Sequence, residues 1–153
     1  MKIISRSLEE TQAAARNFLK EISERKSDKA IVVGLFGDLG AGKTTFTQAL
    51  ARELGIAEFV TSPTFVIMKA YPISQSTIYN LQSTNLVHID AYRLDSGREL
   101  AALNFNDLLD SPQNLILIEW PERVADILPA DMLKINFNFI SENEREIVTL
   151  IGS

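Results

Sequence analysis

The sequence has 153 residues, the size of one domain, so we expect residues 1–153 to fold as a single unit. A net charge of −5 argues against a protein that binds DNA or RNA by itself, because such proteins carry basic patches. The absence of cysteine excludes disulfides and cysteine-ligated metals, and a single histidine excludes a multi-histidine site. No apolar run approaches the roughly 20 residues that span a bilayer. We therefore expect a cytoplasmic protein without a membrane partner.

The apolar pattern alternates between strand and helix spacing in the first third of the chain. It predicts a strand over residues 1–5, a helix over 8–25, a strand over 30–36 and a helix over 43–54. Ser7 and Glu10 form a capping box at the start of the first helix, since each side chain can bind a backbone N–H of the other. Gly55 suits the end of the second helix.

The rest of the chain mixes further strand–helix units with hairpins. It predicts strands over 64–68, 86–92 and 114–120, a loop over 71–84, a helix over 98–109, a short helix from Pro121, and a hairpin of 132–139 with 145–151. The strands over 86–92 and 114–120 are nearly continuous apolar runs, typical of strands covered on both faces. We therefore predict a three-layer α/β fold with a central mixed β-sheet and helices on both faces.

Residues 37–44 read GDLGAGKT, which matches the phosphate-loop pattern G-x-x-x-x-G-K-[ST] between a predicted buried strand and a predicted helix. Glycines let successive N–H groups point at phosphate oxygens, and the helix N-terminus favours an anion. Lys43 supplies a cation for the β- and γ-phosphates, and the Thr44 hydroxyl suits Mg²⁺. The expected phosphate contacts are Asp38, Leu39, Gly40, Ala41, Gly42, Lys43, Thr44 and Thr45. The sequence thus predicts a P-loop NTPase fold that uses ATP and Mg²⁺.

Mg²⁺ on such a loop usually needs a carboxylate at the tip of a neighbouring strand. Glu119 follows four apolar residues at the end of one predicted strand, and Asp90 follows four residues of another. Either acid, taken alone, is also typical of a solvated strand end. With Thr44, these acids are the candidate metal ligands, and with Lys43 they are the candidate catalytic residues.

Three neighbours of these acids have a functional and an ordinary interpretation. His88 either contacts phosphate or orients a water, or it is a hydrogen-bonded strand histidine, the more common case. Arg93 is a phosphate contact or a surface charge. Trp120 follows Glu119 directly, and a core aromatic is its default interpretation.

Five segments resemble one protein family in their order and spacing. They read SLEET, GDLGAGKTTFTQAL, TSPTF, HIDAYRL and EWPERV, and they cover nearly the whole chain. Together they resemble the TsaE family, the ATPase subunit of the bacterial machinery that makes N6-threonylcarbamoyladenosine on tRNA. The loop combined with HIDAYRL and EWPE is far more specific than a phosphate loop alone.

The resemblance implies roles for the matching residues. Lys43 and Thr44 would contact phosphate and Mg²⁺, and Glu119 would contribute to the metal site. Asp90 would lie near the metal and the γ-phosphate, and residues 61–64 would belong to a switch-like loop. The family also implies weak intrinsic ATPase activity, a TsaB–TsaD-type heterodimer as partner, and tRNA contact only through that partner. ATP turnover would then support multiple cycles of modification.

Two other classes of P-loop protein fit the sequence less well. A small-molecule kinase needs a lid that brings cations to the transferred phosphoryl group, whereas residues 70–92 contain no Lys or Arg. A GTP-dependent switch module usually carries N-K-x-D, and no asparagine of this chain is followed by lysine. ATP is therefore favoured over GTP.

Overall fold

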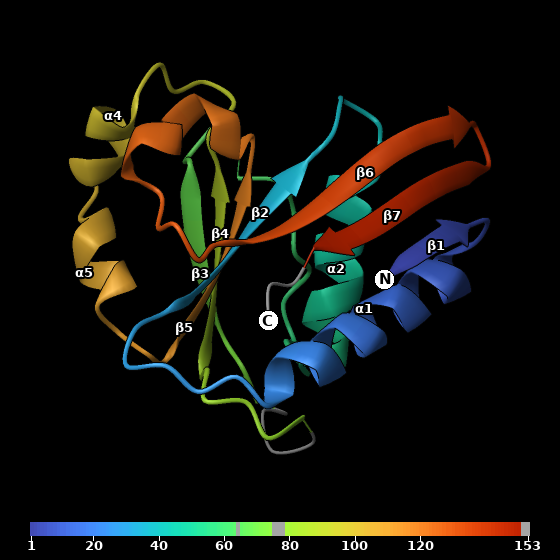
Figure 1. The fold of residues 1–153 in the computed structure, drawn as a ribbon, viewed down its shortest axis with the longest axis horizontal. Coiled ribbons are helices and arrows are strands. Elements are labelled where there is room, and N and C mark those ends of the chain that lie inside the picture. Colours follow the sequence, from blue (N-terminus) through green and yellow to red (C-terminus); the bar gives the residue numbers. More distant parts are fainter. Residues whose placement is uncertain (64, 75–78, 151–153) are drawn as a thin grey trace.

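A computed structural model describes residues 1–63, 65–74 and 79–150 of the protein. Its strands form one sheet in the order β1-β7-β6-β2-β5-β4-β3 (Figure 1). The strands are β1 (Lys2–Ser5), β2 (Ile31–Phe36), β3 (Met68–Pro72), β4 (Asn85–Asp90), β5 (Asn114–Glu119), β6 (Leu133–Ser141) and β7 (Glu144–Leu150). The helices are α1 (Leu8–Ser23), α2 (Lys43–Glu53), α4 (Gly97–Ala101), α5 (Phe105–Leu109) and the 3-10 helix η1 (Pro121–Ile127).

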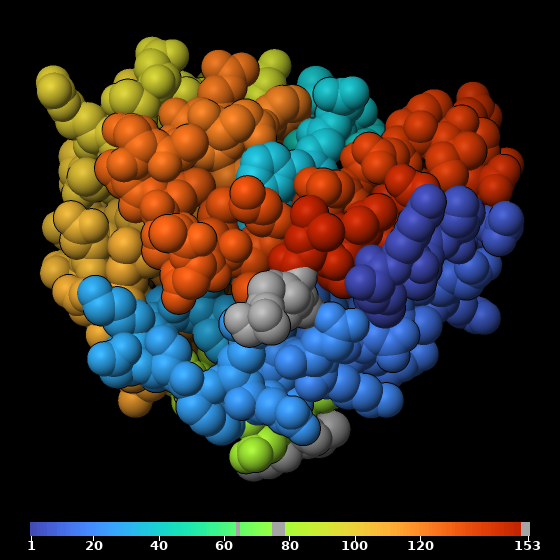
Figure 2. Space-filling model, in the orientation of Figure 1, coloured from blue at the N-terminus to red at the C-terminus, as the bar shows by residue number. Residues whose placement is uncertain are grey.

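The sheet is mixed. The central strands β4, β5, β2 and β6 are parallel, whereas β3, β7 and β1 run antiparallel to their neighbours. β1 lies at one edge against β7, so the first and last strands are side by side, and Figure 2 shows this contact at the surface in blue and red. The expected mixed sheet is therefore confirmed.

Helices cover both faces of this sheet, with α1 and α2 on one side and α4, α5 and η1 on the other (Figure 1). Side chains alternate between the two faces along each strand. In β5, Leu115 and Leu117 join the core under α1 and α2, while Ile116 and Ile118 join the core under the other helices. The three-layer arrangement predicted from the sequence is thus confirmed.

The helix that follows the phosphate loop is held by aromatic packing. Phe46 of α2 is fully buried and lies edge-on between Phe18 of α1 and Phe137 of β6, with ring centroids 6.1 Å and 5.5 Å away. Burying a Phe side chain contributes roughly 1.5–3 kcal/mol. These aromatic contacts fix the axis of α2 and hence the position of its N-terminus.

The capping box predicted at the start of α1 is present in one of its two hydrogen bonds, because Ser7 Oγ accepts from the Glu10 N–H at 3.1 Å.

The prediction of a strand over residues 64–68 was wrong. β3 starts only at Met68, where it pairs with Ile89, and it continues to Pro72 into the predicted loop. The N–H groups of Val66 and Ile67 both donate to the Pro63 carbonyl, so a turn takes the place of strand pairing. Ile67 has φ of 70°, which a strand does not allow. Residue 64 and residues 75–78 lie outside the described residues.

The single helix predicted over residues 98–109 is two short helices, α4 and α5. Asn104 separates them with φ of 64°, a left-handed conformation that asparagine tolerates better than most residues. Because apolar spacing continues across the break, the sequence pattern does not reveal it. Among the described residues, no helix is long and apolar enough to cross a bilayer.

Candidate functional site

The phosphate loop connects the end of β2 to the start of α2, at the edge of the sheet where the parallel strands have their carboxyl ends. Gly42 is the N-cap of α2 with φ of 105°, and Gly40 has φ of 80°. Residues with a Cβ rarely adopt these angles, so glycine is needed for the loop to curl. The loop therefore ends at the N-terminus of α2, whose free N–H groups suit an anion.

A cavity of about 300 Å³ lies beside this loop. It is lined by Leu39, Gly40, Gly42, Lys43, Thr44, Thr45, Ser62, Asp90, Tyr92, Glu119, Trp120 and Arg145. The structure therefore brings most of the predicted site residues to one cavity. Asp38 and Ala41 are not among the described lining residues. Ala41 is buried in the core and donates its N–H to the Asp38 carbonyl, so this hydrogen bond stabilises the turn of the loop.

Lys43 is folded back into the protein. Its side chain is 5% exposed, its Nζ donates to the Gly37 carbonyl at 2.5 Å, and it lies 3.8 Å from the centre of the Trp120 ring. Burial lowers the pKa of Lys43 below its ordinary value, while the nearby carboxylates, first among them Glu119, act to raise it. The ammonium thus sits in a poorly solvated place, where an anionic ligand would be a favourable partner.

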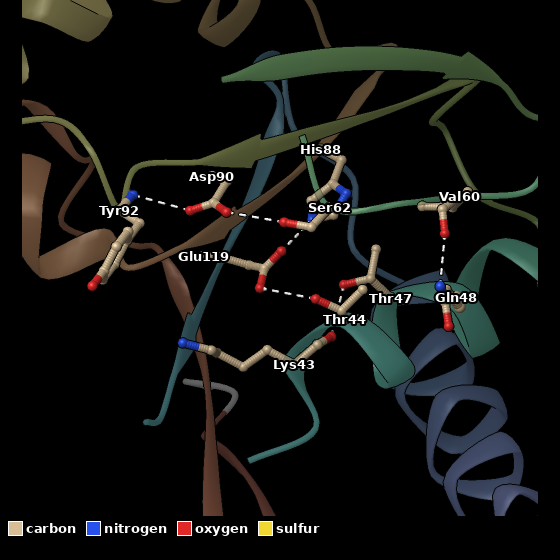
Figure 3. Close-up of polar contacts among 10 residues, drawn as sticks. All are labelled: Lys43, Thr44, Thr47, Gln48, Val60, Ser62, His88, Asp90, Tyr92 and Glu119. Atoms are coloured by element: carbon tan, nitrogen blue, oxygen red, sulfur yellow. Dashed lines mark hydrogen bonds and ion pairs between the residues drawn. The ribbon is translucent and has the colours of Figure 1, made fainter. Parts of the chain in front are cut away.

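Glu119 ends β5 and is buried, with its two oxygens in different contacts (Figure 3). Oε1 accepts from the Thr44 hydroxyl at 3.3 Å, and Oε2 lies 2.7 Å from His88 Nε2. The first contact joins the two residues that the sequence indicates as metal ligands. The second confirms the ordinary interpretation of His88 as a hydrogen-bonded strand histidine and shows that its partner is a site residue.

Asp90 ends β4 and lies directly opposite Glu119 in the parallel ladder. Its Oδ2 accepts from Ser62 Oγ at 3.0 Å and its Oδ1 accepts from the Tyr92 N–H at 3.0 Å (Figure 3). Both acids are buried, and neither is a solvated strand end. Asp90 therefore connects the strand edge to the loop that contains Ser62.

The oxygen donors at this edge fit a magnesium ion. Mg²⁺ takes few protein ligands and keeps waters and phosphate oxygens, so a hydroxyl beside a carboxylate is suitable. Thr44 and Glu119 provide that pair, and Asp90 lines the same cavity. In the described parts of the chain, no three His, Cys, Asp or Glu side chains form a cage, as Zn²⁺ would require.

Arg145 is a cavity residue that the sequence did not indicate. It comes from β7, and its side chain lies against Gly42. A Cβ atom added to Gly42 would be only 2.6 Å from Arg145 Cδ. Its Nε is buried and has no hydrogen-bond partner among the described residues. No sequence signal could have found this residue, because only the pairing of β7 with β6 brings it to the loop.

The sequence did not decide the roles of Trp120 and Arg93. Trp120 packs partly against the core beneath α4 and α5, yet its ring also lines the cavity under Lys43, so the core interpretation describes only one side of it. Arg93 lies over the Phe65 ring, 4.6 Å from its centre, and is not among the described cavity residues.

The strand–loop–helix unit, the two acids at neighbouring strand ends and the three-layer sheet define an α/β protein of the P-loop NTPase fold. The family model described as "Threonylcarbamoyl adenosine biosynthesis protein TsaE" matches residues 5–147. The chain belongs to this TsaE family, whose role is in the biosynthesis of threonylcarbamoyladenosine in tRNA. The resemblance found in the sequence motifs is thereby confirmed.

Individual relatives support the same assignment. The chain is 37% identical to the TsaE protein of Bacillus subtilis over 95% of its length and 82% of the relative. It is 33% identical to that of Treponema pallidum over 96% of its length and 98% of the relative. The crystal structure of Bacillus subtilis YdiB superposes with a TM-score of 0.73 and 33% identity, covering 99% of this chain and 86% of that one.

Two glycines of the loop allow a matched test of the contact with Arg145. Gly40→Ala and Gly42→Ala should each cost about 1–2 kcal/mol of the free energy of unfolding, because both positions have positive φ. Gly42→Ala should cost more, since its new Cβ meets Arg145 Cδ, whereas nothing lies within 4 Å of a Cβ on Gly40. Urea denaturation measures both. Arg145→Ala should remove the excess loss, and equal losses would show that Arg145 moves aside freely.

Proposed function

We propose that the protein binds Mg²⁺–ATP in the cavity beside the phosphate loop and hydrolyses it, as the ATPase subunit of tRNA threonylcarbamoyladenosine synthesis. The observation that carries this proposal is the contact between Thr44 and Glu119. A hydroxyl at the helix start and a buried carboxylate on the neighbouring strand meet at the mouth of a phosphate loop. That is the pair from which P-loop proteins hold the metal of a bound nucleotide.

The phosphate loop, Lys43, Thr44, Glu119 and Asp90 then have distinct tasks. The N–H groups of residues 38–45 bind the phosphates, and Lys43 moves from the Gly37 carbonyl to the β- and γ-phosphates. Thr44 and Glu119 would hold Mg²⁺, which would neutralise charge on the phosphate oxygens. Asp90 would accept a hydrogen bond from the water whose oxygen attacks the γ-phosphorus. As that new P–O bond forms, the bond from the γ-phosphorus to the β–γ bridging oxygen breaks, ADP keeps the bridging oxygen, and the water's proton leaves with the phosphate or to solvent.

Arg145 supports the choice of a strongly anionic ligand. Its guanidinium lies beside Gly42 with one buried N–H that has no acceptor among the described residues. A buried donor without a partner costs roughly 1–3 kcal/mol. Phosphate oxygens in the cavity would satisfy it, and they would also offset the poor solvation of Lys43.

We infer that the partner is a TsaB–TsaD-type heterodimer and that tRNA is contacted through it. The net charge of −5 is unfavourable for binding tRNA directly. The segment that provides Ser62 to the cavity also carries two large exposed apolar side chains, Phe65 at 84% and Phe59 at 76% exposure. Exposed apolar groups of this size suit a protein partner better than a nucleic acid. ATP turnover in such a complex would support repeated cycles of modification.

The nucleotide is tested by calorimetry. The purified protein should bind Mg²⁺–ATP and ADP more tightly than GTP. Lys43→Ala should weaken ATP binding by about 10- to 100-fold, because it removes a charge-assisted hydrogen bond from a poorly solvated place. Arg93→Ala is the matched control, since it removes a cation that lies over Phe65. Equal or tighter binding of GTP would exclude ATP as the preferred nucleotide.

Substitutions of Glu119 and Asp90 should impair different steps. Glu119→Ala should lose the Mg²⁺ dependence of nucleotide binding together with hydrolysis. Asp90→Ala should lower the rate of hydrolysis by about 100-fold or more while changing ATP affinity little, because it acts on the attacking water. Single-turnover hydrolysis and calorimetry separate the two effects. Normal turnover in Glu119→Ala would show that another group holds the metal.

The role in tRNA modification is tested by reconstitution with purified TsaB- and TsaD-type partners. Hydrolysis by this protein alone should be slow, and the partner pair should raise it, because an isolated P-loop protein lacks groups that stabilise transition-state charge. Omitting the protein, or using Lys43→Ala, should leave at most one round of threonylcarbamoyladenosine formation. Full multiple-turnover modification without it would contradict the proposed role and leave the ATPase proposal standing.

A further inference from the structure

His88 is a buried histidine whose ring touches a candidate metal ligand but does not line the cavity. Its side chain is fully buried, and its Nε2 lies 2.7 Å from Glu119 Oε2. We propose that His88 is a positioning residue that fixes the Glu119 carboxylate so that Oε1 faces Thr44 and the metal position. This inference rests on the proposed Mg²⁺–ATP function and adds a residue to it.

The strand register explains why histidine can do this. His88 pairs with Leu117, and Asp90 pairs with Glu119, so the imidazole comes from the neighbouring strand two residue pairs before the carboxylate. All these side chains lie on the face covered by α1 and α2, because Leu86 and Leu117 belong to that core. The His88 ring points toward the Glu119 carboxylate, as Figure 3 shows.

A glutamate has three side-chain torsions and two equivalent oxygens, so by itself it does not select one oxygen for the cavity. A buried carboxylate without partners would also be costly. The bond from His88 satisfies Oε2, and Oε1 is left for the Thr44 hydroxyl and the cavity. In poorly solvated surroundings such a bond is strong, so it holds the carboxylate orientation well. Residues that hydrogen-bond metal ligands in this way typically change metal affinity by about 10- to 100-fold when they are replaced.

A glutamate that holds a cation only accepts hydrogen bonds, so in the proposed arrangement Nε2 of His88 donates to Glu119. Nδ1 is buried and has no hydrogen-bond partner among the described residues, so Nε2 provides the only polar contact found for the ring there. The function of His88 thus depends on a single N–H at the Nε2 position. A glutamine at residue 88 can place an amide N–H near that position, whereas a leucine fills similar space without a donor.

The test compares His88→Leu and His88→Gln by calorimetric titration with ADP, with Mg²⁺ and with EDTA. The measured quantity is the factor by which Mg²⁺ tightens ADP binding. In His88→Leu this factor should fall by about 10- to 100-fold, while the affinity in EDTA stays at the wild-type value. His88→Gln should keep most of the wild-type factor. In ATP hydrolysis, His88→Leu should need more Mg²⁺ for half-maximal rate.

Val87→Ala is the matched control for loss of stability. Val87 is buried on the same strand, but its side chain faces the opposite core, away from Glu119. It should lower the free energy of unfolding without changing the Mg²⁺ factor, and circular dichroism checks that each variant is folded. If Mg²⁺ tightens ADP binding by His88→Leu as much as by the wild-type protein, or if Val87→Ala loses as much of this effect as His88→Leu, the positioning role alone is overturned. If Mg²⁺ does not change ADP binding by the wild-type protein, the proposed function is overturned instead.

Discussion

Parallel pairing of β5 between β2 and β4 determines where the candidate site lies. The three strands end at the same edge of the sheet, with Glu119 opposite Leu35 on one side and Asp90 on the other. The chain leaves β2 directly into the phosphate loop, so the loop, the helix start and both acids meet there. Aromatic packing of α2 against α1 and β6 holds the other side of the cavity. If β5 shifted by one residue, Glu119 would turn to the opposite face of the sheet and the Thr44 contact would be lost.

The site concentrates charge in a place with little water. Lys43, Asp90 and Glu119 are all 5% exposed or less, and each charge has compensating contacts. The ammonium faces a carbonyl and an indole ring, and the carboxylates accept from hydroxyl, imidazole and backbone groups. Burying charged groups costs free energy that a protein without a ligand would have little reason to accept. The proposed anion and its metal would offset part of this local cost.

The sequence predicted the parts of this site that depend on local pattern. The loop residues 37–44 and the acids at 90 and 119 carry signals within a few positions, since an apolar run precedes each of them. The turn at Ile67 and the break at Asn104 were missed because they depend on single backbone conformations that apolar spacing does not record. Arg145 was missed for another reason. Its place beside Gly42 exists only after β7 has paired with β6, more than a hundred residues from the loop.

The segment between α2 and β3 connects the sheet edge that carries Asp90 and Glu119 to the outer surface. Gln48 of α2 donates to the Val60 carbonyl, Ser62 donates to Asp90, and the Asp90 N–H donates to the Ile67 carbonyl. Between these contacts the chain carries Phe65 outward, where the Arg93 guanidinium lies over its ring. Ile67 holds a positive φ that is unfavourable for a β-branched residue, so the turn depends on its hydrogen bonds. Asp90 supports the turn at both ends, through its carboxylate at Ser62 and through its backbone N–H at Ile67. A ligand that displaced Ser62 from the carboxylate would loosen one end of the segment that carries Phe65. If the protein hydrolyses ATP and binds a partner as proposed, this bond would be a physical route from the nucleotide site to the partner surface.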